Sequence, residues 1–109
     1  MIITFCIAST SICWSENVVT ELSTREYARS IGGDALVEII NRESGWNHKA
    51  KNPNSSAIGL CQAMESVHDL PEDYKTNPYT QIDWCMDYIE KRYGTPQKAL
   101  AFWYKNEWF

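Results

Sequence analysis

The stretch NPYTQIDWCMDYIEKRYGTP, residues 77–96, carries the start and stop signals of a helix. Asn77 is a favourable N-cap residue, and Pro78 follows at the first helical position, where its missing N–H is not needed. Apolar residues then recur at the spacing of one helical face, opposite a face of acids and lysine. These apolar residues are Ile82, Cys85, Met86, Ile89 and Tyr93. The pattern predicts a helix of about four turns that Gly94 ends.

Helical signals continue on both sides of this stretch. Thr95-Pro96 repeats the cap and proline, which predicts a last helix over 97–105. Upstream, a short helix over 25–31 stops at Gly32-Gly33, and Asp34 offers a cap for an apolar segment that begins at Ala35.

The apolar segment after Asp34 predicts a second helix that ends near Glu43-Ser44, with Gly45 in the left-handed turn that closes it. Residues 46–56 are a polar loop, 57–64 are expected to form a short helix, and 65–76 form another loop. No hairpin signal or alternating strand pattern is found. The predicted class is all-α, with about five helices.

Composition narrows the possible functions. A chain of 109 residues is one domain, and its 44% hydrophobic and 22% charged residues are ordinary for a globular protein. The net charge is −4 and no dense Lys/Arg cluster is present, so nucleic acid is not expected as a partner. The 13% aromatic residues suit core packing, and they also suit the apolar faces of sugars.

The N-terminal segment is separated from the expected domain. Met1 to Cys13 is apolar but shorter than the ~20 residues that span a membrane, so no stable span is expected. It lacks a basic leader and a clear cleavage site. A degenerate signal, a short docked helix and a strand-like arm all remain open. We divide the chain into residues 1–22, an arm or signal segment, and residues 23–109, the folded domain.

Four cysteines are present, at positions 6, 13, 61 and 85, with no CxxC spacing. His48 and His68 are the two histidines, so neither a zinc site nor any other metal is expected. Cys61 and Cys85 both fall at apolar positions of predicted helices. Buried free thiols and a disulfide between them remain open.

Glu43 is the first candidate for chemistry. It lies in the last turn of an apolar helix, where the negative end of the helix dipole disfavours its ionised form. Burial against Trp46 would act in the same direction. A carboxylic acid with a raised pKa can donate a proton near neutral pH. The alternative is a solvated surface glutamate.

Three segments around Glu43 carry a family resemblance. They are RESGWN at 42–47, the loop NPNSSA at 52–57 and GLCQAM at 59–64. Their order and spacing resemble the lytic transglycosylases of the soluble lytic (SLT) type, which belong to the lysozyme-like superfamily. The Asn-Pro-x-Ser form and the aromatic ending at 103–109 are similar to a branch found in small secreted actinobacterial and phage proteins. The resemblance covers residues 24–109 and implies a small all-α, lysozyme-like fold related to goose-type lysozyme.

The resemblance also implies roles for particular residues. Glu43 takes the position of the single catalytic carboxylate, and Gln62 takes that of a substrate-contacting glutamine. The other implied substrate contacts are loop hydroxyls and aromatic rings, at Ser55, Ser56, Trp103 and Tyr104. The sequence departs from the family pattern at Cys61, where Met or Pro is usual, at Ser56, where Gly is common, and at Trp103, where Tyr is frequent.

The activity implied is cleavage of the β-1,4 bond between N-acetylmuramic acid and N-acetylglucosamine in peptidoglycan strands, leaving a 1,6-anhydro-muramyl end. No cofactor is implied, and we expect a monomer that acts in the cell envelope, secreted or periplasmic, or in a phage virion. A lysozyme-type muramidase, a hydrolase, is an alternative that needs a second acid. Glu65, Asp69 and Asp73 lie in loops, but solvated surface acids are the better interpretation of them. A non-catalytic glycan-binding module is the third possibility.

Overall fold

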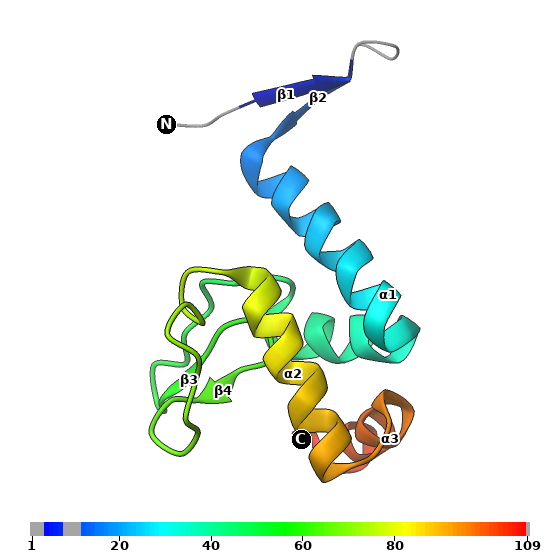
Figure 1. Ribbon diagram of the computed structural model, residues 1–109, viewed down its shortest axis with the longest axis vertical. Helices are drawn as coiled ribbons and strands as arrows, with labels where there is room; N and C mark the ends of the chain where they lie inside the picture. Colours follow the sequence, from blue (N-terminus) through cyan, green and yellow to red (C-terminus); the bar gives the residue numbers. More distant parts are fainter. Residues whose placement is uncertain (1–3, 8–11, 109) are drawn as a thin grey trace.

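Three helices dominate the computed structural model of the chain, which describes residues 4–7 and 12–108 (Figure 1). They are α1 (Glu16–Ser44), α2 (Pro78–Arg92) and α3 (Pro96–Asn106). The predominantly helical class predicted from the sequence is confirmed. None of the helices in the described ranges is long and apolar enough to cross a membrane.

Helix α1 begins earlier than expected and bends where the sequence predicts a break. It starts at Glu16 rather than near residue 25, and the expected boundary between residues 22 and 23 lies inside it. Gly33 leaves the helical conformation, with φ 69° and ψ −169°, so the predicted break is confirmed as a kink between two helical halves. The first half extends away from the rest of the molecule (Figure 1).

Two strands precede α1, in the N-terminal segment for which a strand-like arm was one of the alternatives left open. They are β1 (Thr4–Ile7) and β2 (Ile12–Ser15), which pair antiparallel. Of the segment 1–22 that we expected to be an arm or a signal, residues 1–3 and 8–11 lie outside the described residues.

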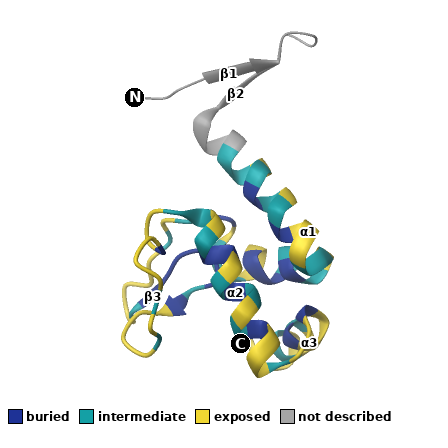
Figure 2. Ribbon diagram, viewed as in Figure 1, coloured by how far each residue is buried: buried dark blue, intermediate teal, exposed yellow. Residues whose placement is uncertain are grey.

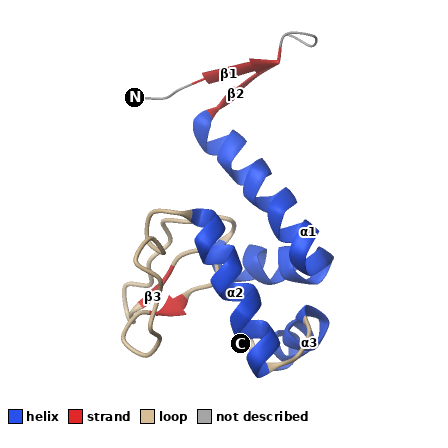
Figure 3. Cartoon of the chain, in the orientation of Figure 1, coloured by secondary structure: helices blue, strands red, loops and turns tan. Residues whose placement is uncertain are grey.

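The predicted helix over 57–64 is wrong. Two short antiparallel strands occupy this region, β3 (Ala57–Ile58) and β4 (Ala63–Met64), and the chain reverses between them (Figure 3). Gly59 and Gln62 have positive φ angles of 80° and 53°. Left-handed residues in the middle of the segment are incompatible with a continuous right-handed helix.

Helices α2 and α3 begin as their cap signals predict. The side chain of Asn77 accepts hydrogen bonds from the backbone N–H groups of Tyr79 and Thr80, at 3.0 and 3.4 Å. Thr95 accepts in the same way from Lys98, at 3.2 Å. These contacts satisfy donors that a helix start leaves without partners.

The core lies where the second half of α1 meets α2 and α3 (Figure 2). The predicted apolar face of α2 is buried, since Ile82, Cys85 and Ile89 are all 0% exposed. Residues of α1, the β3–β4 turn and α3 complete this core, and they include Leu36, Ile39, Ile40, Leu60 and Ala99.

A disulfide joins Cys61 in the β3–β4 turn to Cys85 in α2, with the Cα atoms 6.0 Å apart. Of the two states left open by the sequence, the bridged one is formed. The predicted helix around Cys61 is absent, so the thiol reaches α2 from a turn. The bridge fixes the turn that carries Gln62 against the helical core.

Candidate active site

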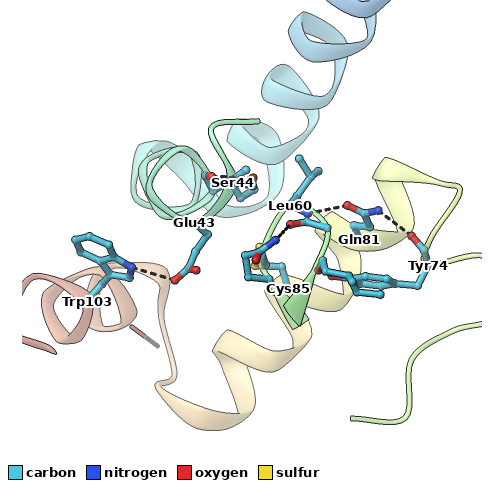
Figure 4. The surroundings of a disulfide bond; sticks show 12 residues. Glu43, Ser44, Leu60, Tyr74, Gln81, Cys85 and Trp103 are labelled. Carbon is cyan, nitrogen blue, oxygen red and sulfur yellow. Dashed lines mark hydrogen bonds between the residues drawn. A yellow bond between two sulfur atoms is a disulfide. The ribbon is translucent and has the colours of Figure 1, made fainter. Parts of the chain in front are cut away.

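Glu43 occupies the last turn of α1. Gly45 closes the helix as predicted, with φ 60° and a hydrogen bond from its N–H to the carbonyl of Asn41 at 2.9 Å. Figure 4 shows the Glu43 side chain between Trp103 on one side and Leu60 and Cys85 on the other. The carboxyl group therefore lies where the end of α1, helix α3 and the β3–β4 turn come together.

Trp103 is the hydrogen-bonding partner of this carboxyl group. Its indole Nε1–H donates to Oε1 of Glu43 at 3.0 Å (Figure 4). Burial raises the pKa of Glu43 above its ordinary value, and the indole hydrogen bond lowers it by a smaller amount. The raised pKa agrees with the expectation from the sequence. Trp46, expected to help bury the acid, is itself 4% exposed and has the guanidinium of Arg25 over its ring, 5.1 Å from the centroid.

Arg42 supports the ring that contacts Glu43. Its guanidinium lies 4.9 Å from the ring centroid of Trp103 and 4.7 Å from that of Tyr104, and it forms an ion pair with Glu38 at 2.6 Å. Cation–π contacts of this kind hold an aromatic ring in one orientation. Tyr104 is 57% exposed, so one of its faces remains open to a ligand.

Gln62 is half-buried in the turn between β3 and β4. Its amide nitrogen donates to the carbonyl of Gly59 at 2.9 Å and to that of Ala50 at 3.4 Å. Both contacts use Nε2, so the side-chain oxygen is the atom that can accept a hydrogen bond from a substrate hydroxyl.

The hydroxyls of Ser55 and Ser56 stabilise the loop that contains them. Ser55 Oγ accepts from the N–H of Ala57 at 3.2 Å. Ser56 Oγ lies 2.7 Å from Ser66 Oγ and accepts from the N–H of Ser66 at 3.1 Å. Neither serine forms a hydrogen bond with Glu43 among the described residues.

Gln81 is a buried residue that the sequence analysis did not identify as part of the site. It is 0% exposed, and its Oε1 accepts from the N–H of Leu60 at 2.8 Å. Its Nε2 donates to the carbonyl of Tyr74 at 2.9 Å (Figure 4). The same nitrogen donates to the carbonyl of His48 at 3.0 Å. One amide therefore holds three backbone segments together. The available signal was position, since Gln81 shares the buried face of α2 with Cys85 and Ile89 at helical spacing.

Tyr74 and Gly59 complete this arrangement. The Tyr74 hydroxyl donates to the carbonyl of Ile58 at 3.1 Å, and burial raises the pKa of Tyr74 to about 12. A side chain at position 59 would place its Cβ 2.8 Å from Oε1 of Gln81 and 3.0 Å from the Tyr74 oxygen. Glycine is needed here for space as well as for its φ angle.

Tyr93 is a partly buried tyrosine just after the end of α2. Burial is the main cause that raises the pKa of Tyr93, the charge of Arg92 lowers it, and the charges of Tyr88 and Glu43 raise it. The Tyr93 ring packs on Phe102 of α3, with centroids 5.3 Å apart. Tyr93 therefore packs against α3, the helix that carries Trp103.

The three loop acids considered as a second catalytic carboxylate have other partners or are exposed. Glu65 forms an ion pair with Lys75 at 2.6 Å, and Asp73 accepts hydrogen bonds from Asn77 and Thr80. Asp69 is exposed. Burial and the Trp103 hydrogen bond are the two causes of the Glu43 pKa shift, and no neighbouring carboxylate contributes. Within the described ranges, no group of three or more His, Cys, Asp or Glu side chains is placed to hold a metal ion.

Comparison with known proteins identifies the family of the chain. No curated protein and no solved structure matches the chain significantly. The family model of the transglycosylase SLT domain matches residues 22–106, which include all the residues discussed in this site. The chain therefore belongs to the transglycosylase SLT domain family.

Proposed function

We propose that this protein is a lytic transglycosylase that cleaves the glycan strands of peptidoglycan, with Glu43 as its single general acid and base. The family indicates transglycosylase activity on peptidoglycan as the class of reaction. The observation that supports the finer proposal is the environment of Glu43. Its pKa is raised by burial, and one of its oxygens is held by Trp103.

In the first step, Glu43 acts as an acid. Because the indole occupies Oε1, the proton is carried on Oε2. Glu43 transfers this proton to the glycosidic oxygen between N-acetylmuramic acid and N-acetylglucosamine, and the bond from that oxygen to C1 of the muramyl residue breaks. The acetamido group of the substrate stabilises the positive charge that develops at C1.

In the second step, the resulting carboxylate acts as a base. It removes the proton from the muramyl 6-hydroxyl, whose oxygen attacks C1 and closes the 1,6-anhydro ring. The proton returns to Glu43, so no water is consumed and the enzyme is regenerated. The Trp103 N–H stabilises the carboxylate between the two steps, because a hydrogen bond to an ionised acceptor is stronger than one to a neutral acceptor.

A hydrolase of the two-carboxylate kind needs a second acid at a defined distance from the first. The partners of Glu65 and Asp73 and the exposure of Asp69 favour the single-carboxylate route. We propose that the sugar contacts Gln62 Oε1, Trp103 and the open face of Tyr104. Ser55 and Ser56 are proposed to act mainly by shaping the loop.

The mass of the products tests this proposal. Purified peptidoglycan digested in water enriched in ¹⁸O should give anhydro-muramyl ends that lack the heavy oxygen. Reducing ends that carry ¹⁸O and are heavier by one water would contradict the lyase proposal in favour of the muramidase. Release of no fragment by a correctly folded protein would favour the binding module.

The proposed substrate lies outside the cytoplasmic membrane, so the protein acts there. A disulfide such as Cys61–Cys85 is typical of proteins in oxidising compartments. We propose that the protein is either exported or carried in a phage particle. Because all the proposed site residues lie in one chain, we expect it to act as a monomer.

A further inference from the structure

A hollow of about 260 Å³ lies next to the candidate site. We call it the Arg92 hollow, and its walls include Gln62, Met64, Val67, Tyr88, Arg92 and Trp108. Cys61 lines it as well, so it adjoins the disulfide beside which Glu43 lies (Figure 4). A ligand that reaches Gln62 therefore passes close to this hollow.

The cation in the hollow forms no ion pair with a carboxylate among the described residues. The guanidinium of Arg92 packs over the rings of Trp108, Tyr93 and Tyr88, at 5.3, 5.6 and 5.7 Å from their centroids. Its Nη1 donates to the Tyr88 hydroxyl at 2.7 Å. The chain's three other arginines each form an ion pair with a carboxylate, whereas Arg92 forms none within the described part of the chain.

The lack of an ion pair at Arg92 matters because a guanidinium has five N–H donors and pairs best with a planar carboxylate. The aromatic rings hold the group in a fixed orientation without neutralising its charge. The side chains that line the hollow include no Asp or Glu, although the chain as a whole carries a net charge of −4. On this side Arg92 therefore faces no carboxylate of the described residues, whereas the hollow on its other side also includes Asp69 and Asp87.

The remaining surface of the hollow combines polar groups of Gln62, His68 and Tyr88 with apolar side chains that are open to solvent. Val67 is 70% exposed, Trp108 is 51% exposed and Met64 is 36% exposed. An apolar wall beside a single guanidinium is complementary to a ligand in which a small apolar group stands next to a carboxylate. A neutral sugar ring offers no group that uses the charge.

We infer that the Arg92 hollow binds the peptide stem attached to the muramyl residue, with Arg92 pairing with a stem carboxylate. This inference rests on the proposed function, since it concerns the same substrate at a neighbouring position. Stem peptides combine small apolar residues with free carboxylates, which is the chemistry that the hollow fits. The stem then determines which muramyl unit of the strand is seated beside Glu43.

A binding experiment separates this inference from the catalytic proposal. All proteins carry Glu43→Gln so that the ligand is not cleaved. The ligands are a muramyl oligosaccharide with its peptide stem, the same oligosaccharide after an amidase has removed the stem, and a chitin oligosaccharide of equal length. The stem should strengthen binding by roughly ten-fold, the size expected for a hydrogen bond to a charged group.

The added variant Arg92→Gln should abolish the gain from the stem. Lys98→Gln, which removes one positive charge from an exposed site on α3, should keep it. Arg92→Lys, which keeps the charge, should retain part of the gain, and equal melting temperatures of the variants establish that all of them fold.

Three results would overturn the inference. The first is equal affinity for ligands with and without the stem. The second is a stem-dependent gain that survives Arg92→Gln. The third is that the stem-free ligand, whose lactyl carboxylate is exposed, binds best and depends on Arg92, because the anion recognised is then the lactyl group and not the stem. Failure of catalysis would appear separately, as a wild-type protein that releases no fragments.

Discussion

The indole nitrogen of Trp103 donates a 3.0 Å hydrogen bond to Oε1 of Glu43, and so joins helix α3 to the end of helix α1 across 60 residues of sequence. The Glu43 carboxyl group is thereby oriented by a helix that lies much further along the sequence. Arg42, the immediate neighbour of Glu43, holds the same indole from its face. The position of the proposed proton donor therefore depends on how α3 packs.

Replacing Trp103 by Phe should move the pH dependence of cleavage. The substitution removes the hydrogen bond that lowers the pKa of Glu43, so this pKa should rise further. Because the first step needs the protonated acid, the alkaline limb of the pH–rate profile should shift to higher pH. The rate at the optimum should fall by roughly ten-fold, the size expected for loss of one hydrogen bond to a charged group.

The control for this substitution is Tyr104→Phe, at the next position on the same helix, which should leave the alkaline limb in place. An unchanged pH profile for Trp103→Phe would show that the indole does not influence the ionisation of Glu43.

Replacing Gln81 by Leu should destabilise the fold. The N–H of Leu60 and the carbonyls of His48 and Tyr74 would lose their partners in a buried position. Such losses amount to about 3 kcal/mol of unfolding free energy. Urea unfolding measures this change, and Gln97→Leu on the exposed face of α3 is the matched control. Equal destabilisation by both variants would contradict the role given to the buried amide.

Removing the disulfide should also lower stability. The bridge closes a loop with a sequence separation of 24, so the double variant Cys61→Ala/Cys85→Ala should lose about 3 kcal/mol of unfolding free energy. Its cleavage rate should fall as well, because the turn that carries Gln62 is no longer fixed to α2. A peptide map of the wild type without reductant should show residues 61 and 85 linked. Unlinked peptides, or equal urea midpoints, would contradict this prediction.

Local signals explain the parts of the fold that the sequence predicted correctly. Asn77, Thr95 and Gly45 act on backbone groups within a few residues, and apolar spacing identifies the buried face of α2. The strands β3 and β4 were missed because two residues are too few to show alternation. The left-handed conformation of Gln62 is not expected of a non-glycine residue.

Fewer features of the candidate site could be predicted from local sequence patterns. The last turn of α1 marked Glu43 as an unusual acid, but its pairing with Trp103 is a contact across 60 residues that no local pattern reveals. The position of Trp103 came from the family resemblance instead. Gln81 was overlooked although a polar residue on a buried helical face is a visible signal. The cation–π contacts of Arg42 and Arg92 depend on tertiary packing and carry no signal in the sequence.

Glu43 is proposed as the proton donor, and the rate at which purified peptidoglycan loses turbidity tests this role most directly. Glu43→Gln keeps the shape of the side chain but cannot exchange a proton, so it should lower the rate by at least about a hundred-fold. Glu90→Gln, the same change at an exposed position on α2, should clear at the wild-type rate. Clearing by a folded Glu43→Gln protein at the rate of its Glu90→Gln control would contradict the claim.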